Sequence, residues 1–445
     1  MVALVIAAGE RYFIEVRYAI MHDDAHDAPG GEARKGEGRP VGAETHVVAL
    51  VAGKLYAPEE IPGPVAVVLE GAKIRDVWRE TDADTVRQRL EEHMPGATVE
   101  VIDLRPLCLA PGYIDLHTHG FRGHDVTTGS QEDVKAMARE LPRTGVTAFF
   151  PTIATLGRTE TLQQVQCIAN VAESQEHSSS AEVLGMRLEG PFISRTKKGA
   201  QYEPGIRRPD PVEMEGLATA GRGWVRIVDY APEEDEGGLF LATLVRLGIL
   251  ACIGHTAATY EQAILAIDEG ARHSTHLFNA MSPLEHRAPG VLGALLTDQR
   301  ATLEFIADGI HLHPAMIRLA TAARSIRDVA LVTDAVAPAG LPEGEYEFVG
   351  RKVTVREGAV RLANGSLAGS ILTLDRAVRN IVNFTGLGWP EAIFMATRTP
   401  AQIAGVAARK GRVAPGLDAD LIALDSQGFV QRTWVRSVLA DEGVT

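Results

Sequence analysis

The 445-residue chain is poor in cysteine, has no excess of positive charge and contains no long apolar run, and each shortage excludes a class of protein. Its three cysteines, Cys108, Cys167 and Cys252, are too few and too widely spaced for a disulfide framework, so we expect a reducing, cytoplasmic compartment. The 44 Lys and Arg residues face 58 Asp and Glu residues, and the net charge of −14 repels nucleic acid and anionic membrane surfaces. No apolar run approaches the ~20 residues that cross a bilayer, and the N-terminus lacks the basic start of a secretory signal. What remains is an ordinary globular protein with ample length for a large core.

Residues 111–338 contain eight apolar, strand-like runs that alternate with amphipathic, helix-like stretches. This rhythm is expected of βα units, and eight of them without a Gly-rich phosphate loop favour a closed barrel over an open, doubly wound sheet. The sequence therefore predicts an α/β fold with a (β/α)8 TIM-like barrel. The eight runs are GYIDLHTH, VTAFFPT, VLGMRLEG, VRIVDYAP, ILACIGHT, HSTHLFN, ATLEFIAD and VALVTDA.

The two ends of the chain are expected to build a small β-sandwich domain together. Residues 46–110 contain short apolar runs separated by Pro, Gly and charged residues, which predicts the first part of that domain. Residues 339–445 contain further strand-like runs and helical stretches, and we expect them to return strands to the sandwich and to pack helices on the barrel. Residues 1–45 are interpreted as an N-terminal extension and flexible linker, because residues 22–45 are nearly free of large apolar side chains.

Polar side chains end five of the eight runs, and barrel enzymes place their catalytic groups at the carboxyl ends of the strands. Two histidines at the end of the first run alternate, so both point to the same face of that strand. A lone His or Glu at a strand end is more often structural, but the joint placement favours a metal hydrolase site. The six residues are His117, His119, Glu189, His255, His276 and Asp334.

Three of these residues, Glu189, His255 and His276, match the two-His, one-carboxylate set of catalytic zinc, which leaves a position open for water. A divalent ion lowers the pKa of its bound water to about 7 and polarises a carbonyl group, which suits attack on an amide or ester. Asp334 can take up a proton during attack and deliver it to the departing nitrogen. Zinc is the first choice, but iron, cobalt and manganese accept the same ligands. Outside this set, His273 is expected to be structural or solvated, and the role of His124 stays open.

From about residue 47 to the C-terminus, the chain resembles the N-acetylglucosamine-6-phosphate deacetylase family of the amidohydrolase superfamily. The first motif is shared across the superfamily, whereas THLFNAM together with LEGP and LAGS is more specific. The motifs that carry the resemblance are LAPGYIDLHTHG (109–120), LEGPFIS (188–194), GHTAAT (254–259), THLFNAM (275–281), APG (288–290), ADGIHLHP (307–314), VTDA (332–335) and LAGSILTLDRAVRN (367–380).

The resemblance implies hydrolysis of the acetamide of N-acetylglucosamine 6-phosphate to acetate and glucosamine 6-phosphate, with Asp334 as the acid and base. It implies one ion held by Glu189, His255 and His276, and a second that His117 and His119 can hold with Glu189 as the bridge. The implied substrate contacts come from Asn279, Ala280, Arg287, His311, Leu367, Ala368 and Gly369.

The same resemblance bears on one further contact and on the oligomeric state. The Arg that matches Arg287 can reach the neighbouring subunit's site, which implies a homodimer. Many relatives have a His after the KKGA segment that polarises the acetyl carbonyl, whereas this chain has Gln201, which can donate only a neutral hydrogen bond.

Three alternatives stay open at this point. The chain could act on another N-acyl sugar phosphate, including the galactosamine epimer, which differs at one hydroxyl group. It could act on an N-acyl amino acid or a cyclic amide, although the cyclic-amide branch commonly uses a Lys that the fourth run, VRIVDYAP, lacks. It could also be a non-catalytic scaffold, but such a chain would be expected to have lost the ligand residues.

Overall fold

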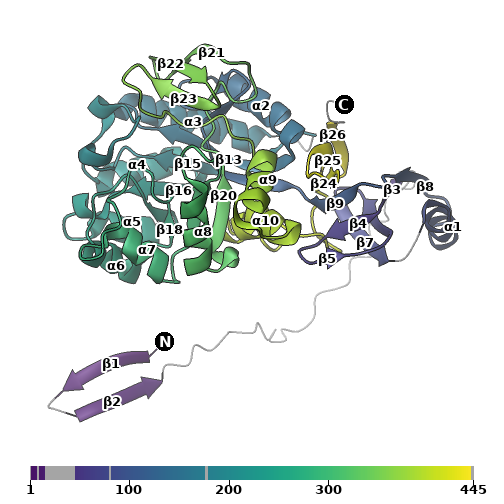
Figure 1. Ribbon diagram of the computed structural model, residues 1–445, viewed down its shortest axis with the longest axis horizontal. Coiled ribbons are helices and arrows are strands. Elements are labelled where there is room, and N and C mark those ends of the chain that lie inside the picture. The colour runs from purple at the N-terminus through teal and green to yellow at the C-terminus, as the bar shows by residue number, and fades with distance from the viewer. Residues whose placement is uncertain (1, 8–9, 16–45, 80–81, 176–178, 442–445) are drawn as a thin grey trace, which may run out of the picture. The chain divides into compact units, whose positions relative to one another are not determined.

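The computed structural model describes residues 2–7, 10–15, 46–79, 82–175 and 179–441, and the chain divides into two units, residues 1–43 and 44–445 (Figure 1). In the first unit, strands β1 (Val2–Ala7) and β2 (Glu10–Glu15) pair in antiparallel fashion. The predicted linker, residues 22–45, lies outside the described residues. All further elements belong to the second unit.

A curled parallel sheet organises the second unit, and all eight predicted runs form strands within the described residues. Six strands are paired in the order β10-β13-β15-β16-β17-β18, and β19 pairs with β20. Isolated parallel bridges join His273 to Thr302, between β18 and β19, and Thr118 to Ala335, between β10 and the end of β20. The strands are β10 (Tyr113–Thr118), β13 (Val146–Ala154), β15 (Met186–Glu189), β16 (Val225–Tyr230), β17 (Leu250–Ile253), β18 (His273–Ser274), β19 (Leu303–Ile306) and β20 (Val329–Val332).

Helices connect successive strands of this sheet and cover it. Because strands such as β13 are buried along their whole length, their sequences are continuously apolar rather than alternating. Ser130 caps the first connecting helix, with Asp133 completing a capping box. The connecting helices are α2 (Gln131–Glu140), α3 (Arg158–Ser174), α4 (Pro211–Ala220), α5 (Leu239–Arg246), α6 (Tyr260–Glu269), α7 (Gly290–Thr297) and α8 (Pro314–Ala323).

Two further sheets share one apolar core, in which Leu50, Leu109, Leu421 and Trp434 are buried, and the first of them contains strands from both ends of the second unit. One sheet has the order β26-β25-β24-β9-β4-β5 and the other β7-β6-β3-β8, with α1 (Ala83–His93) on the latter. Their strands are β3 (His46–Ala52), β4 (Lys54–Tyr56), β5 (Glu60–Ile61), β6 (Val65–Glu70), β7 (Lys73–Arg79), β8 (Thr98–Asp103), β9 (Cys108–Pro111), β24 (Leu421–Leu424), β25 (Val430–Val435) and β26 (Val438–Asp441).

Three of the strands that follow residue 338 depart from the prediction. β21 (Gly344–Phe348), β22 (Arg351–Arg356) and β23 (Ala359–Leu362) form a sheet of their own instead of joining the sandwich (Figure 1). Their apolar side chains pack on Ala154 and Val336, at the end of the parallel sheet. Alternating side chains predict a strand but do not identify its partner, so the sequence assigned these strands to the wrong sheet.

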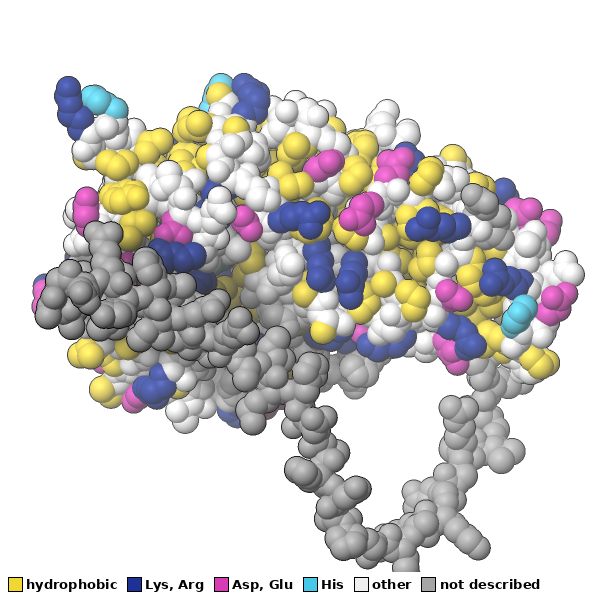
Figure 2. Space-filling view, turned by 90° about the horizontal axis from the view of Figure 1, so that it is seen from below, with side chains coloured by type: hydrophobic (Ala, Val, Ile, Leu, Met, Phe, Trp, Pro, Cys, Tyr) yellow, Lys and Arg dark blue, Asp and Glu magenta, His cyan; other side chains and the backbone are white. Residues whose placement is uncertain are grey.

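Three more helices, α9 (Leu374–Thr385), α10 (Trp389–Ala396) and α11 (Arg398–Ile403), follow, and buried side chains of each join the core of the parallel sheet. Among the described residues, no helix combines the length and apolar character that a membrane span requires. On the face seen in Figure 2, the described basic and acidic side chains are interspersed rather than gathered by sign.

Candidate active site and metal centre

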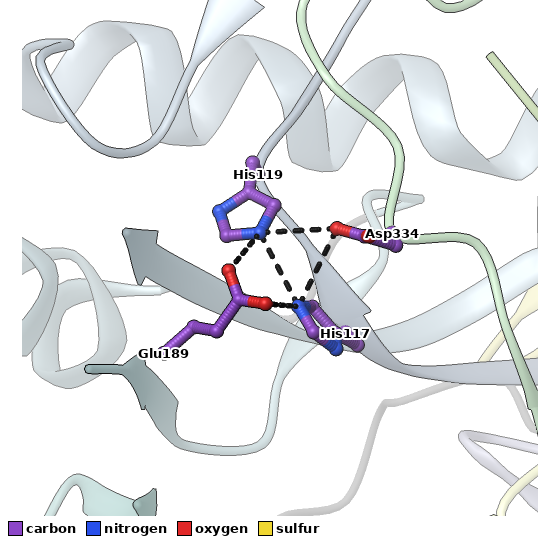
Figure 3. A group of neighbouring side chains, drawn as sticks. All are labelled: His117, His119, Glu189 and Asp334. Carbon is purple, nitrogen blue, oxygen red and sulfur yellow. Dashed lines mark hydrogen bonds and ion pairs between the residues drawn. The ribbon is translucent and has the colours of Figure 1, made fainter. Parts of the chain in front are cut away.

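Four of the predicted residues converge at the carboxyl ends of the parallel strands, where His117, His119, Glu189 and Asp334 point toward one another (Figure 3). The Nε2 atoms of His117 and His119 lie 3.2 Å apart. Oδ1 of Asp334 lies 3.2 Å from Nε2 of His119 and 3.5 Å from Nε2 of His117. Glu189 completes this first group, with Oε2 at 3.1 Å from Nε2 of His119.

A second group shares Glu189 with the first and adds His255 and His276. Oε1 of Glu189 lies 3.0 Å from Nε2 of His255 and 2.9 Å from Nε2 of His276. The two Nε2 atoms are 3.1 Å apart. The structure thus brings all six strand-end residues into one cluster, in which every member is buried.

The donor chemistry of the cluster fits two cations, one in each group. Nδ1 of His119 lies 3.0 Å from the carbonyl oxygen of Thr152, and Nδ1 of His255 lies 2.8 Å from that of Lys197. A ring that donates its Nδ1 hydrogen to a carbonyl presents a lone pair at Nε2. Lone pairs that face one another and carboxylate oxygens at about 3 Å attract a divalent ion, because a cation satisfies all of them at once.

Electrostatics within the cluster point the same way. Burial alone would lower the pKa of His119, but hydrogen bonds to Asp334 and Glu189 outweigh it and raise that pKa to about 9. Burial would likewise raise the pKa of the Glu189 carboxyl, but the neighbouring imidazoles hold it well below its ordinary value. Asp334 also has a lowered pKa, because His117 and His119 outweigh its burial. The cluster therefore stabilises positive charge between ionised carboxylates.

Three members of the cluster have left-handed backbone conformations, with φ of 46° at His255, 23° at His276 and 48° at Asp334. Such values are uncommon for residues with a side chain and cost of order 1–3 kcal/mol each. Each of these residues lies just beyond the end of a strand, where the change of backbone direction turns the side chain inward. Strain of this kind is a feature of functional sites.

The cluster opens into a cavity of about 230 Å³ that also contains most of the predicted substrate contacts. The predicted residues that line it are Gln201, Asn279, Ala280, His311, Leu367 and Gly369. Ala368 is instead buried in the apolar cluster with Val336 and Phe348, and Arg287 is exposed on the loop that precedes α7. The cavity wall therefore lacks any Lys or Arg side chain among the described residues.

Two lining residues are held by specific hydrogen bonds. Gln201 donates from Nε2 to Glu189, and its Oε1 accepts from the backbone N–H of Thr155 at 2.7 Å. The Gln201 amide is thus attached to the carboxylate that both groups share. Nδ1 of His311 lies 2.6 Å from Oδ2 of Asp308, which leaves Nε2 as the free ring nitrogen.

Sequence reasoning missed several residues of the site. Phe348 lines the cavity and lies edge-on to His119, with ring centroids 5.9 Å apart, but it belongs to the sheet that the sequence assigned elsewhere. Ser366 also lines the cavity and carried no signal. Glu304, which contacts His117, did carry one, because a charge in the middle of the apolar run ATLEFIAD must be paired when that strand is buried.

The two remaining histidines named from the sequence lie outside the cluster. His273 is buried and hydrogen-bonded to Thr302 and Glu304, as expected of a structural residue. His124, whose role the sequence left open, lies 3.1 Å from Asp133 at the start of α2.

Comparison with known proteins identifies the family of this chain. The sequence matches the amidohydrolase family over residues 108–441. An N-acetylgalactosamine-6-phosphate deacetylase of Escherichia coli O157:H7 is 39% identical over 332 residues, which are 75% of this chain and 87% of that protein. The N-acetylglucosamine-6-phosphate deacetylase of Bacillus subtilis (strain 168) is 39% identical over 334 residues, which are 75% of this chain and 84% of that protein.

Solved structures give a similar result. The N-acetyl-D-glucosamine-6-phosphate deacetylase of Mycobacterium smegmatis, solved as a mutant in complex with N-acetyl-D-glucosamine-6-phosphate, has a TM-score of 0.80 and 30% identity. The match covers 89% of this chain and 100% of that chain. The N-acetylglucosamine-6-phosphate deacetylase of Pasteurella multocida has a TM-score of 0.80 and 29% identity, covering 88% of this chain and 99% of that one.

Proposed function

Because the chain belongs to the amidohydrolase family, we propose that it hydrolyses the acetamide of N-acetylglucosamine 6-phosphate to acetate and glucosamine 6-phosphate. The observation that carries this proposal is the pair of ligand groups that share Glu189 at the base of a cavity. A divalent ion bound there supplies Lewis acidity, which polarises a carbonyl group and acidifies water.

In this proposal, Asp334 accepts and donates the proton that is transferred during hydrolysis. Its pKa is lowered, so at neutral pH it is a carboxylate and can accept a proton from water that attacks the acetyl carbon. The protonated carboxyl then donates to the amide nitrogen as the C–N bond breaks, and the carboxylate is restored. Asp334 lies between the two imidazoles of the first group, which orient its Oδ1 atom.

The remaining cavity residues bind and orient the substrate. Gln201 is proposed to donate its second Nε2 hydrogen to the acetyl oxygen, since its other polar contacts fix the plane of the amide. His311, Asn279 and Ala280 are proposed to contact the sugar phosphate. The turn of Leu367, Ala368 and Gly369 is proposed to support the sugar, and a Cβ at Gly369 would lie 2.5 Å from Val336.

Arg287 is proposed to bind the phosphate in the cavity of a second copy of the chain. Its own cavity is lined by no Lys or Arg among the described residues, and Arg287 is exposed on a loop. A guanidinium group suits a phosphate because two parallel N–H groups match two oxygens. A homodimer would therefore complete each site.

Several coarser features are proposed with this function. The two bridges beside β18 and β20 support closure of the parallel sheet into an eight-stranded (β/α)8 barrel over residues 111–338. We propose that residues 46–110 and part of 339–445 form a β-sandwich domain, and that residues 1–45 are an extension. Zinc is the proposed ion, one or two per subunit, with iron, cobalt or manganese as the alternatives. The unpaired cysteines support a cytoplasmic location.

The test compares N-acetylglucosamine 6-phosphate with unphosphorylated N-acetylglucosamine, with N-acetylgalactosamine 6-phosphate as a third substrate. Loss of the phosphate contacts should cost about 2–5 kcal/mol, so kcat/KM should fall by about 30-fold or more without the phosphate. Arg287→Ala should raise KM for the phosphorylated sugar only, whereas Arg208→Ala, at an exposed Arg paired with Glu236, should change nothing. Equal efficiency on the first two sugars would overturn the proposal, and the third decides the epimer.

A further inference from the structure

A layer of fully buried charged residues lies in the parallel sheet that carries the metal cluster. Arg187 of β15, Asp229 of β16 and Glu304 of β19 each have no exposed surface. Arg187 contacts Asp229 at 3.0 Å and Glu304 at 2.7 Å, so its charge is shared between two carboxylates. Buried charges without partners cost several kcal/mol, so each member of this layer depends on the others.

Glu304 has four donors around its two oxygens. Oε1 lies 3.0 Å from Nδ1 of His117 and 2.9 Å from the backbone nitrogen of His276. Oε2 lies 3.0 Å from Nε2 of His273 and 2.7 Å from NH1 of Arg187. One carboxylate oxygen thus contacts a residue from each of the two ligand groups.

The four ligand imidazoles differ in what holds their other ring nitrogen. His119 and His255 donate to backbone carbonyls, and Nδ1 of His276 has no hydrogen-bond partner among the described residues. In this set, His117 alone has a carboxylate partner, Glu304. A carboxylate fixes the tautomer of a ligand imidazole, fixes its ring plane and raises its basicity more than a carbonyl does.

We propose that Glu304 is a positioning residue that sets metal occupancy of the His117, His119, Glu189 and Asp334 group, and that it ties this group to the other through the backbone of His276. The inference rests on the metal-dependent hydrolysis proposed above. By accepting the Nδ1 hydrogen of His117, Glu304 keeps the Nε2 lone pair directed into the group. By accepting the N–H of His276, it fixes the strained backbone that directs that ring to Glu189.

The decisive variant is Glu304→Gln, which keeps the shape but replaces one acceptor oxygen with a donor. All four partners of Glu304 are donors in this arrangement, so the new NH2 group opposes two of them. We expect zinc titration of the metal-free chain, followed by calorimetry and elemental analysis, to show two ions per wild-type chain. In the variant, affinity for one ion should fall by about 10- to 100-fold while the other is retained.

Asp229→Asn is the matched control, because it removes the other carboxylate from Arg187 without contacting a ligand imidazole. It should lower the melting temperature and leave both zinc affinities unchanged. If Glu304→Gln does not fold, the same zinc titration is made with Glu304→Asp. This variant keeps the charge but withdraws the oxygens from His117, so it should also lose affinity for one ion. A folded Glu304 variant with two wild-type affinities, or a wild-type chain that binds a single ion, overturns the inference.

These metal titrations need no substrate, so they are independent of the proposed reaction. A chain that binds two ions in the expected way but cleaves no acetamide would refute the proposed function and leave the role of Glu304 intact. Cobalt in place of zinc gives a second readout, because the visible absorption of the weakened site should change in Glu304→Gln and stay the same in Asp229→Asn.

Discussion

The metal cluster and a second cluster of ionisable side chains are built in opposite ways. In the metal cluster, carboxylates face imidazoles whose free nitrogens also face one another. The second cluster joins β14 (Glu182–Val183), which pairs with β13 of the parallel sheet, to the segment that leads into β24, and we call it the ionic latch. Its members are Glu182, Arg409, Lys410, Asp418 and Asp420, of which Lys410, Asp418 and Asp420 are buried.

In the ionic latch every carboxylate has a permanent cation beside it. Lys410, which is only 2% exposed, lies 2.9 Å from Glu182 and 3.1 Å from Asp418 and also donates to Asp420. Burial would raise the pKa of Asp418, but the Lys and Arg side chains lower it to about 2. The carboxylates of the latch are neutralised by Lys and Arg side chains of the chain itself, whereas those of the metal cluster need bound cations. This difference separates a structural ion network from a binding site.

The largest effect is expected from a substitution within the metal cluster. Asp334→Asn should lower kcat by about 100- to 10,000-fold, because the amide cannot accept a proton, while the ion in the Glu189, His255 and His276 group is retained. Steady-state rates and elemental analysis of the same sample measure both quantities. A variant with a near wild-type rate would place the proton transfer on another residue.

The next largest effect is expected when the ionic latch is broken, which should lower stability without changing catalysis. Lys410→Met removes the buried cation from three carboxylates and should cost about 3–5 kcal/mol in the free energy of unfolding, measured with denaturant. Metal content and kcat at low temperature should not change. Lys73→Met is the control, because Lys73 contacts Asp418 from a half-exposed position and should cost less than about 1 kcal/mol.

The smallest effect is the pH dependence of the latch. The pKa of Asp418 is lowered from 3.8 in the unfolded chain to about 2 in the folded chain. Its contribution to the free energy of unfolding is therefore present above about pH 4 and disappears as the pH falls toward 2. The free energies of unfolding of wild type and Asp418→Asn should therefore converge by about 1.5 kcal/mol as the pH falls from 5 to 2.5. Parallel curves would show that Asp418 does not titrate in this window.

The strand-end residues could be predicted because two simple rules apply to them. Alternation along a strand and the common edge of parallel strands bring His117 and His276 together without knowledge of any side-chain packing. Arg287 and Gln201 show where this reasoning ends. Whether Arg287 reaches a cavity depends on the path of a loop. The direction of the Gln201 amide depends on the backbone N–H of Thr155, which binds its Oε1 atom and turns its Nε2 atom toward Glu189.

Long-range pairing was predicted less well than local structure. All eight parallel strands were found, because each is a short apolar run that must be buried on both faces. The β21–β23 sheet was assigned to the wrong neighbours, and Phe348 was lost from the site with it. Glu304 could have been found by the rule that a charge within a buried strand needs partners, which also applies to Arg187 and Asp229.

The position of β9 has a consequence for synthesis of the chain. This strand lies between β4, which precedes it closely, and β24, which is synthesised long after it. Until β24 arrives, one edge of β9 has unpaired backbone groups, and the apolar core around Trp434 is incomplete. A nascent chain that already contains every metal ligand would still expose this unpaired strand edge, so chaperones that shield strand edges should bind until β24 has been synthesised.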